Sequence, residues 1–224
     1  MKERNYNRRY TKEYGFWQSL FYKIFVRIVV TPLAKILYNF KTTGQENLDN
    51  NKRYLFAPNH VSYLDPPLVT LATGQKVAYM AKHELFTDKS WLLRTLVVSL
   101  GAFAVNRDNP EIATFKTVFD LIKTDWSLGI FPEGRITTSN NLSKIQKGFI
   151  SIAKKAKFEI VPVGVCGFDG YSRKPFEKNI TLKIGTPISY ELADDEIVKI
   201  WANQICEMTG MINELVEDNV LQYS

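Results

Sequence analysis

The chain has 224 residues and a mass of 25.8 kDa, which suits one domain, or one domain with an appendage. Hydrophobic residues make up 45% and charged residues 23%, which excludes a disordered, collagen-like or coiled-coil protein. Two cysteines are too few for a disulfide scaffold, and no Cys–His cluster predicts a zinc site, so we expect a reduced setting and no bound metal.

The net charge of +6 is unevenly distributed along the chain. Residues 1–41 hold nine basic and two acidic side chains, whereas residues 190–224 hold eight acidic and one basic. The basic and aromatic N-terminal region, residues 1–41, indicates an interaction with an anionic surface. A membrane and a nucleic acid are both candidates at this point.

The N-terminal region also has a helical pattern of apolar residues. Across residues 16–40, apolar pairs recur at the spacing of one broad helical face, and Lys23, Arg27 and Lys35 fall between them. The longest run without a charge, 28–34, is far shorter than the roughly 20 residues of a membrane-spanning helix. The interrupted apolar core also argues against a cleavable signal peptide.

Thr31-Pro32 predicts a break in this pattern, because threonine can cap a helix and proline favours its first position. We therefore expect two amphipathic helices, about 16–30 and 32–40, that lie in a membrane interface. The alternative is a helical hairpin packed on the body of the protein. In either case residues 1–41 are interpreted as an N-terminal segment and 42–224 as the main domain.

From residue 42 onward, short β-rich runs alternate with helical stretches. The expected strands are 53–57, 77–81, 102–106, 129–131, 160–167 and 179–184. The expected helices are about 66–74, 89–99, 110–124, 143–157 and 193–220. This alternation predicts an α/β fold with a single mixed β-sheet flanked by helices.

Polar side chains follow four of the predicted strands, where open α/β sheets bind ligands. The residues concerned are Asn59, His60, Asp65, Lys82, Glu84, Arg107, Glu133, Gly134 and Arg135. One histidine, several carboxylates and several cations therefore converge on one edge of the sheet. This combination predicts a reaction centre there.

His60 and Asp65 have the residue types of a general base and its partner. A histidine takes a proton from a hydroxyl, and a carboxylate on its other ring nitrogen fixes the tautomer. The alternative is that Ser62 or Asp65 only caps the following helix while His60 packs. Ser62 is not a convincing nucleophile, so the pair is expected to act as a base on a substrate hydroxyl, which itself attacks the second substrate.

The cations Lys82, Arg107 and Arg135 suit a phosphate group, since arginine binds phosphate through a planar fork and lysine as a point charge. Gly134 permits a tight turn and a close backbone approach. Glu133 is expected to orient a cation or a hydroxyl, and the alternative is a solvated loop acid.

These residues together resemble the glycerolipid acyltransferase family. Four blocks match in order: NHVSYLD (59–65), GAFAVNR (101–107), FPEG (131–134) and VPVGV (161–165), with AKHEL (81–85) as a further similar stretch. The resemblance implies that His60 is the catalytic base and Asp65 its partner. It also implies that Arg107 binds phosphate and that Lys82 lies on the substrate side. The third block departs from the common F-P-E-G-T-R-S, because Arg135 follows Gly134 directly and Ile136 takes the usual arginine position.

The resemblance implies transfer of a fatty acyl group to the 2-hydroxyl of 1-acyl-sn-glycerol 3-phosphate (lysophosphatidic acid), which gives phosphatidic acid. Acyl-CoA or acyl carrier protein would be the donor substrate, and no cofactor is expected. The expected location is the cytoplasmic face of the cell membrane, with peripheral or monotopic attachment to anionic phospholipid. The alternatives are a different lysophospholipid acceptor, or a basic membrane- or nucleic-acid-binding module without enzymatic activity. The apolar stripe of residues 16–40 disfavours nucleic acid.

Overall fold

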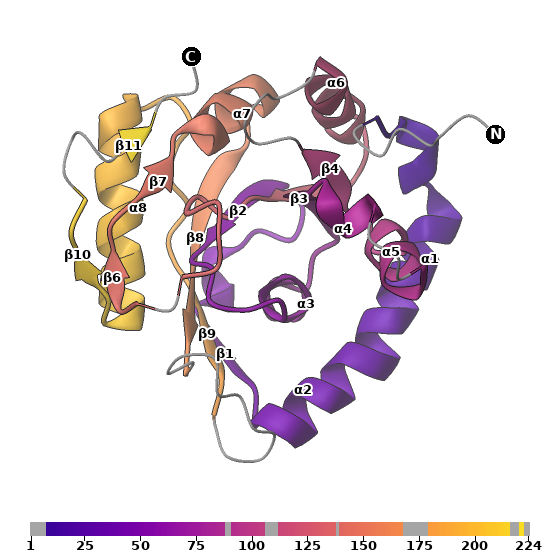
Figure 1. The fold of residues 1–224 in the computed structure, drawn as a ribbon, viewed down its shortest axis with the longest axis horizontal. Helices are drawn as coiled ribbons and strands as arrows, with labels where there is room; N and C mark the ends of the chain where they lie inside the picture. Colours follow the sequence, from indigo (N-terminus) through magenta and orange to yellow (C-terminus); the bar gives the residue numbers. More distant parts are fainter. Residues whose placement is uncertain are drawn as a thin grey trace.

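The protein is built around a central sheet, seen in a computed structural model that describes residues 8–87, 91–105, 112–137, 139–167, 179–215 and 220–221 (Figure 1). The sheet has the strand order β1-β9-β8-β2-β5-β3-β4. Its strands are β1 (Lys41–Thr43), β2 (Tyr54–Pro58), β3 (Val77–Lys82), β4 (Phe103–Val105), β5 (Ser127–Gly129), β8 (Glu159–Cys166) and β9 (Thr181–Ile184). The β8–β9 pair is antiparallel and the other neighbouring pairs are parallel, so the predicted mixed α/β sheet is confirmed.

Helices surround this sheet. The α-helices are α1 (Phe16–Phe25), α2 (Thr31–Tyr38), α3 (Asp65–Thr73), α4 (Glu84–Thr87), α5 (Trp91–Ser99), α6 (Ile112–Leu121), α7 (Gly148–Ala156) and α8 (Asp194–Thr209). Shorter helical turns are η1 (Thr11–Tyr14), η2 (Val26–Val30) and η3 (Gln45–Asn47). Two small parallel ribbons complete the described fold: β6 (Asn141–Leu142) with β10 (Ile212–Asn213), and β7 (Ile145–Gln146) with β11 (Val220–Leu221).

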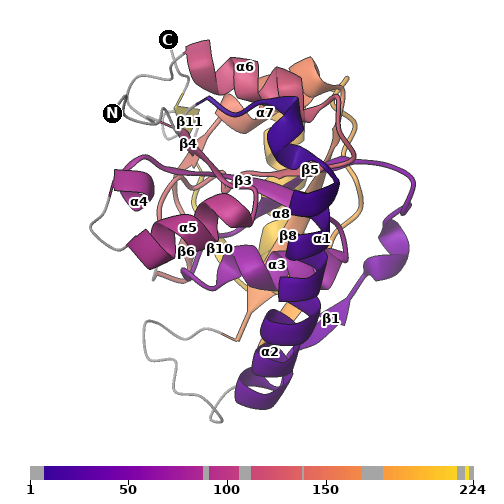
Figure 2. The same cartoon turned by 90° about the vertical axis from the view of Figure 1, so that its right-hand side faces the viewer.

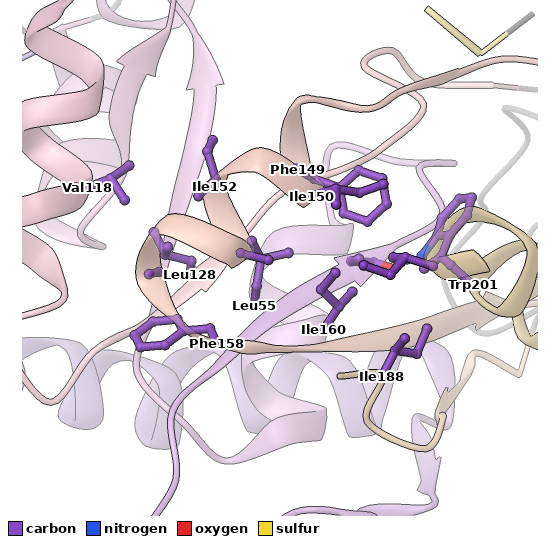
Figure 3. Packing of buried hydrophobic residues seen from close by; sticks show 14 of the residues in the cluster. Leu55, Val118, Leu128, Phe149, Ile150, Ile152, Phe158, Ile160, Ile188 and Trp201 are labelled. Atoms are coloured by element: carbon purple, nitrogen blue, oxygen red, sulfur yellow. The ribbon is translucent and has the colours of Figure 1, made fainter. Parts of the chain in front are cut away.

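The two faces of the sheet are covered by different helices, because side chains alternate along each strand. In β2, Leu55 and Ala57 join a buried cluster with residues of α6, α7 and α8. Tyr54 and Phe56 join the cluster on the other face, with residues of α2 and α3. Figure 3 shows the first cluster, in which Phe149 of α7 lies beside Trp201 of α8, with ring centroids 6.0 Å apart.

Several predicted boundaries were wrong for local reasons. The expected helix 143–157 begins only at Gly148, because Ile145–Gln146 pairs as β7 with β11. The expected helix 193–220 ends at Thr209, where Gly210 takes a left-handed φ of 77°. The strand expected at 129–131 is β5, which lies two residues earlier. The first residues of the expected helix 110–124 lie outside the described residues.

The break predicted at Thr31-Pro32 is absent. Phe25, Val26, Val30 and Thr31 all have right-handed helical backbone angles, and the chain runs from α1 through η2 into α2 (Figure 2). The turn η2 is a π-helix, in which the Thr31 N–H bonds to the Val26 carbonyl and the Thr31 hydroxyl donates to the same oxygen at 2.9 Å. A widened turn accommodates Pro32, which lacks an N–H and would crowd the preceding turn of a regular α-helix.

The inner side of this helical segment packs on the body of the protein. Tyr14 and Tyr22 are buried and lie edge-on to Trp126, with ring centroids 5.4 and 4.8 Å away. The Tyr22 hydroxyl is 2.7 Å from the Thr70 hydroxyl of α3 and accepts the Val77 N–H at 3.0 Å. The division into residues 1–41 and 42–224 stays a prediction, and these contacts indicate that both parts share a core.

The outer side of the same segment is exposed and apolar. Its large exposed apolar side chains are Phe16, Trp17, Leu20, Phe21, Ile24, Ile28, Val29, Leu33 and Ile36. Phe16 and Trp17 retain 72% and 79% of their accessible area. Within the described part of the chain, no helix is both long and apolar enough to cross a membrane. The segment thus contacts the body on one side and leaves an apolar stripe on the other.

Candidate active site

The candidate site lies at the carboxyl end of β2, where the chain turns into α3. Asn59, directly after the strand, is buried, and its side chain accepts the Val165 N–H at 2.7 Å and donates to the Val165 carbonyl at 3.3 Å. Val165 is near the end of β8, so Asn59 ties the ends of two adjacent strands together. His60 therefore begins a short loop, and the residue before it is held in place by the Asn59–Val165 hydrogen bonds.

His60 and Asp65 are in direct contact. The His60 Nδ1 lies 2.8 Å from Asp65 Oδ2, and the same oxygen accepts the N–H groups of Val61 at 2.8 Å and Ser62 at 2.7 Å. With Nδ1 bonded to the carboxylate, Nε2 is the ring nitrogen available to take a proton. The sequence predicted this contact. The alternative, in which His60 only packs and makes no contact with Asp65, is wrong.

Asp65 is fully buried, whereas the His60 side chain keeps 13% of its accessible area. Burial raises the pKa of Asp65, and the hydrogen bonds from His60, Ser62 and Val61 oppose that rise. Its second oxygen, Oδ1, has no hydrogen-bond partner among the described residues. The pair therefore has one solvent-facing member that can exchange a proton and one enclosed member that can orient it.

The loop after β5 holds His60 from the other side. The Phe131 ring stacks on the imidazole, with centroids 3.9 Å apart and an interplanar angle of 24°. Glu133 Oε1 accepts the His60 N–H at 2.8 Å, and the Thr137 N–H donates to the His60 carbonyl at 2.7 Å. The third sequence block thus fixes both the ring and the backbone of His60.

Glu133 is 6% exposed, so the solvated loop acid is excluded. Glu133 accepts hydrogen bonds from the His60 N–H and the Thr137 side chain, and its expected role in orienting a cation or a hydroxyl stays a prediction. Gly134 has φ 69°, and its N–H closes a tight turn on the Phe131 carbonyl at 3.0 Å, as the glycine predicted.

Glu133 should make the stability of the fold depend on pH. Burial raises its pKa, opposed by hydrogen bonds from the Thr137 side chain and the His60 N–H. The folded state then binds more protons than the unfolded state between the two pKa values, so wild-type stability falls as pH rises through that window. Glu133→Gln removes this titration while its amide oxygen can still accept the His60 N–H. We expect urea unfolding to show the variant gaining stability relative to wild type as the pH rises above about 4, the ordinary pKa of a glutamate. A difference that does not change with pH would contradict this assignment.

The structure describes two of the three predicted phosphate-binding cations. Lys82 ends β3 and Arg135 follows the Gly134 turn, and both side chains are exposed at the carboxyl end of the sheet. Arg107 lies outside the described residues. Their roles in substrate binding stay predictions.

Ser62 and the two cysteines are poorly suited to act as protein nucleophiles. Ser62 is 1% exposed, and its hydroxyl oxygen accepts the Leu64 N–H at 2.9 Å. Burial raises the pKa of the Cys166 and Cys206 thiols, which disfavours the thiolate. In the described ranges, no group of three or more His, Cys, Asp or Glu residues is placed to hold a metal ion.

The stacking of Phe131 and the backbone bonds of Glu133 and Thr137 were not predicted. An aromatic residue after a strand reads equally well as core, and Thr137 lies outside any recognised block. Asn59 was noted only as a polar residue after a strand, and its link to Val165 depends on which strands are adjacent in the sheet.

An enclosed carboxylate in contact with a histidine at the carboxyl edge of an α/β sheet is an arrangement typical of general-base sites. The family model described as Acyltransferase matches residues 39–166, which is more than half of the chain and includes all four sequence blocks. The chain belongs to the acyltransferase family.

Several curated proteins are similar to this chain. The 1-acyl-sn-glycerol-3-phosphate acyltransferase of Bacillus subtilis is 32% identical over 152 residues, covering 66% of this chain and 73% of that protein. The protein of the same name from Streptococcus pneumoniae is 29% identical over 194 residues, covering 83% of this chain and 70% of its own length.

The fold also resembles a solved structure, the 1-acyl-sn-glycerophosphate (LPA) acyltransferase PlsC from Thermotoga maritima. The TM-score is 0.64 at 20% identity, and the match covers 85% of this chain and 78% of that one. This likeness supports the fold.

Proposed function

We propose that this protein transfers a fatty acyl group to the 2-hydroxyl of 1-acyl-sn-glycerol 3-phosphate and so forms phosphatidic acid. The observation that carries the proposal is the His60–Asp65 contact of 2.8 Å at the carboxyl edge of the sheet. The names of the similar bacterial proteins support this choice of acceptor. The donor is an acyl thioester of coenzyme A or of acyl carrier protein.

The reaction follows from the available nitrogen of His60. Nε2 takes the proton of the acceptor hydroxyl as its oxygen attacks the thioester carbonyl carbon. The new C–O bond forms, the C–S bond breaks, and the departing sulfur takes the proton back from the imidazolium. Asp65 stabilises the transient positive charge, while Phe131 and Glu133 keep the ring in place. No covalent acyl-protein intermediate is required.

The acceptor is held through its phosphate by Arg107 and Lys82, with Arg135 as a further cation. Arg107→Ala should therefore raise the KM for the lysolipid by about 10- to 150-fold, the range for hydrogen bonds to a charged group. The KM for the acyl donor should change little. Arg107→Lys should restore only part of the loss, because the planar fork is missing. Steady-state kinetics with each substrate varied in turn make the measurement, and equal effects on both KM values would indicate a structural arginine.

A panel of acceptors tests the proposed substrate. The purified protein is given one acyl-CoA and equal amounts of 1-acylglycerol 3-phosphate, other lysophospholipids and monoacylglycerol. We expect the highest kcat/KM with 1-acylglycerol 3-phosphate. A higher value with another lysophospholipid would support the second candidate, which the altered third block favours, since Ile136 stands where the family commonly has arginine. No transfer to any acceptor would support a non-enzymatic binding module.

We also propose that the apolar stripe of α1, η2 and α2 rests in the cytoplasmic leaflet of the cell membrane as a peripheral or monotopic anchor. Lys23, Arg27 and Lys35 are exposed on the same segment, where they can reach anionic headgroups. Trp17 and Phe21 supply the aromatic contacts typical of an interfacial helix. An apolar stripe with flanking cations suits lipid better than nucleic acid, whose partners stack on open aromatic faces.

A matched pair of phenylalanines tests the anchor. Phe16 on the stripe is 72% exposed and Phe119 on α6 is 45% exposed, so serine at either position should leave the fold stable. Phe16→Ser should weaken binding to anionic vesicles by about tenfold or more, because burying a phenylalanine contributes about 1.5–3 kcal/mol. Phe119→Ser should bind like wild type in the same sedimentation assay. High salt should release the wild type only partly, since the apolar contribution is not screened. Equal vesicle binding by the two variants would show that the apolar stripe does not contact the membrane.

A further inference from the structure

A second feature of the molecule lies beside the candidate active site. A cavity of about 290 Å³ opens between α6, α7 and the loop after β5. Its walls are mostly apolar and include Phe115, Phe131 and Phe149. The volume is at the low end for ligand pockets, which suits part of a substrate rather than a whole one.

Polar side chains also line this cavity. Thr114 lines it and is 2% exposed, and its hydroxyl has no hydrogen-bond partner among the described residues. Gln146 adds an amide to the same lining. A buried hydroxyl without a partner costs free energy unless a ligand bonds to it. The cavity therefore fits an apolar chain that carries hydrogen-bonding groups.

The one charged side chain in the described lining is Lys155, which is exposed. Its Nζ lies 4.5 Å from the Phe115 ring centroid, and no described carboxylate lies within ion-pair distance. Its neighbour Lys154 is paired with Asp194 and does not line the cavity. Among the described residues, no carboxylate compensates Lys155, so its charge can meet the anionic end of a ligand.

Phe131 connects the cavity to the candidate active site. It lines the cavity, and its ring also stacks on His60 at 3.9 Å. A ligand in the cavity therefore lies against the same ring that packs on His60, and Lys155 belongs to the same lining.

We propose that this cavity binds the phosphopantetheine arm of the acyl donor. The arm is an apolar chain with two amides, which match Thr114 and Gln146, and it ends in a phosphate, which matches Lys155. A fatty acyl chain has neither amides nor a charged end, so it leaves these groups unused. The inference rests on the proposed function, and coenzyme A and acyl carrier protein both carry this arm.

Donors that lack parts of the arm test each contact. Lys155→Met should raise the KM for acyl-CoA by about two- to fivefold, the range of an exposed ion pair, and should not affect an acyl-pantetheine donor without phosphate. Thr114→Val should raise the KM for both donors by about two- to tenfold, the range of a neutral hydrogen bond. Neither change should alter the KM for the lysolipid. Lys154→Met is the matched control, and it should behave like wild type with every donor. Parallel runs with acyl-CoA and acyl carrier protein identify the natural source of the arm.

Two results would overturn the inference. One is an equal effect of Lys155→Met and Lys154→Met on every donor. The other is a change in preferred acyl-chain length in Thr114→Val without a change in arm dependence, which would place the acyl chain in the cavity.

Binding of 4′-phosphopantetheine alone, measured by calorimetry, separates this inference from the proposed function. If the protein transfers no acyl group but Lys155→Met still binds 4′-phosphopantetheine more weakly than wild type, the cavity assignment is supported and the proposed function is wrong. If the protein transfers acyl groups but does not bind 4′-phosphopantetheine, the proposed function is supported and the cavity assignment is wrong.

Discussion

Replacing His60 with alanine is expected to reduce acyl transfer by about 10²- to 10⁴-fold, the contribution of a general base. The side chain is partly exposed and its loss leaves the Asn59 anchor intact, so the fold should persist. The measurement is kcat/KM with 1-acylglycerol 3-phosphate, together with thermal unfolding of both proteins. His83→Ala is the control, because His83 is exposed on the turn after β3.

Asp65→Asn should also impair transfer severely, by up to about 10⁴-fold, because an amide favours the wrong imidazole tautomer and does not stabilise the imidazolium. Wild-type turnover in His60→Ala would rule out the base assignment. Wild-type turnover in Asp65→Asn alone would leave His60 as the base and remove the orienting role of the carboxylate.

Replacing Tyr22 with alanine should destabilise the whole protein by about 3–5 kcal/mol, the usual cost of removing a buried aromatic side chain. Tyr22 is 3% exposed, packs on Trp126 and bonds to Thr70 and Val77. Its neighbour on the same helix, Phe21, is 45% exposed, so Phe21→Ala should change stability by no more than about 0.5 kcal/mol. Urea unfolding followed by tryptophan fluorescence compares the two. Equal, small effects would show that the helix is not part of the core.

The same contacts predict the effect of deleting residues 1–41. The sequence interpretation separates residues 1–41, as an N-terminal segment, from a main domain at 42–224. However, Arg9 donates to the carbonyls of Val98 and Ala102 at 2.9 Å, and Tyr14 covers Trp126. Deletion would expose this surface, which is why the serine variant of Phe16 is the better probe of membrane binding.

The sequence predicted those parts of the fold that depend on local pattern. The strands around Leu55, Ala78 and Ile160 were found because buried strands are short apolar runs between turn residues. The spacing of His60 and Asp65 allowed their contact, because Asp65-Pro66-Pro67 predicts a turn, and the resemblance of the four blocks favoured it. The edge strand β1 was missed, because its three residues carry no apolar pattern and pair with a strand far along the chain.

The supports around His60 were not predictable in the same way. Phe131 stacks on the imidazole only because β5 lies beside β2, and strand order is a tertiary property. The helical continuity through Pro32 had the same origin: α3 and Trp126 pack against the segment and stabilise a widened turn that local preference alone disfavours.

Direct transfer by His60 is tested most directly by following a radiolabelled acyl group. The protein is mixed with labelled acyl-CoA, first alone and then with 1-acylglycerol 3-phosphate, and protein and lipid are separated after quenching. We predict no label on the protein in either case, and label at the 2-position of phosphatidic acid with one free thiol released per product when the acceptor is present. Label on the protein that moves to lipid when acceptor is added, for example from Ser62, would contradict direct transfer.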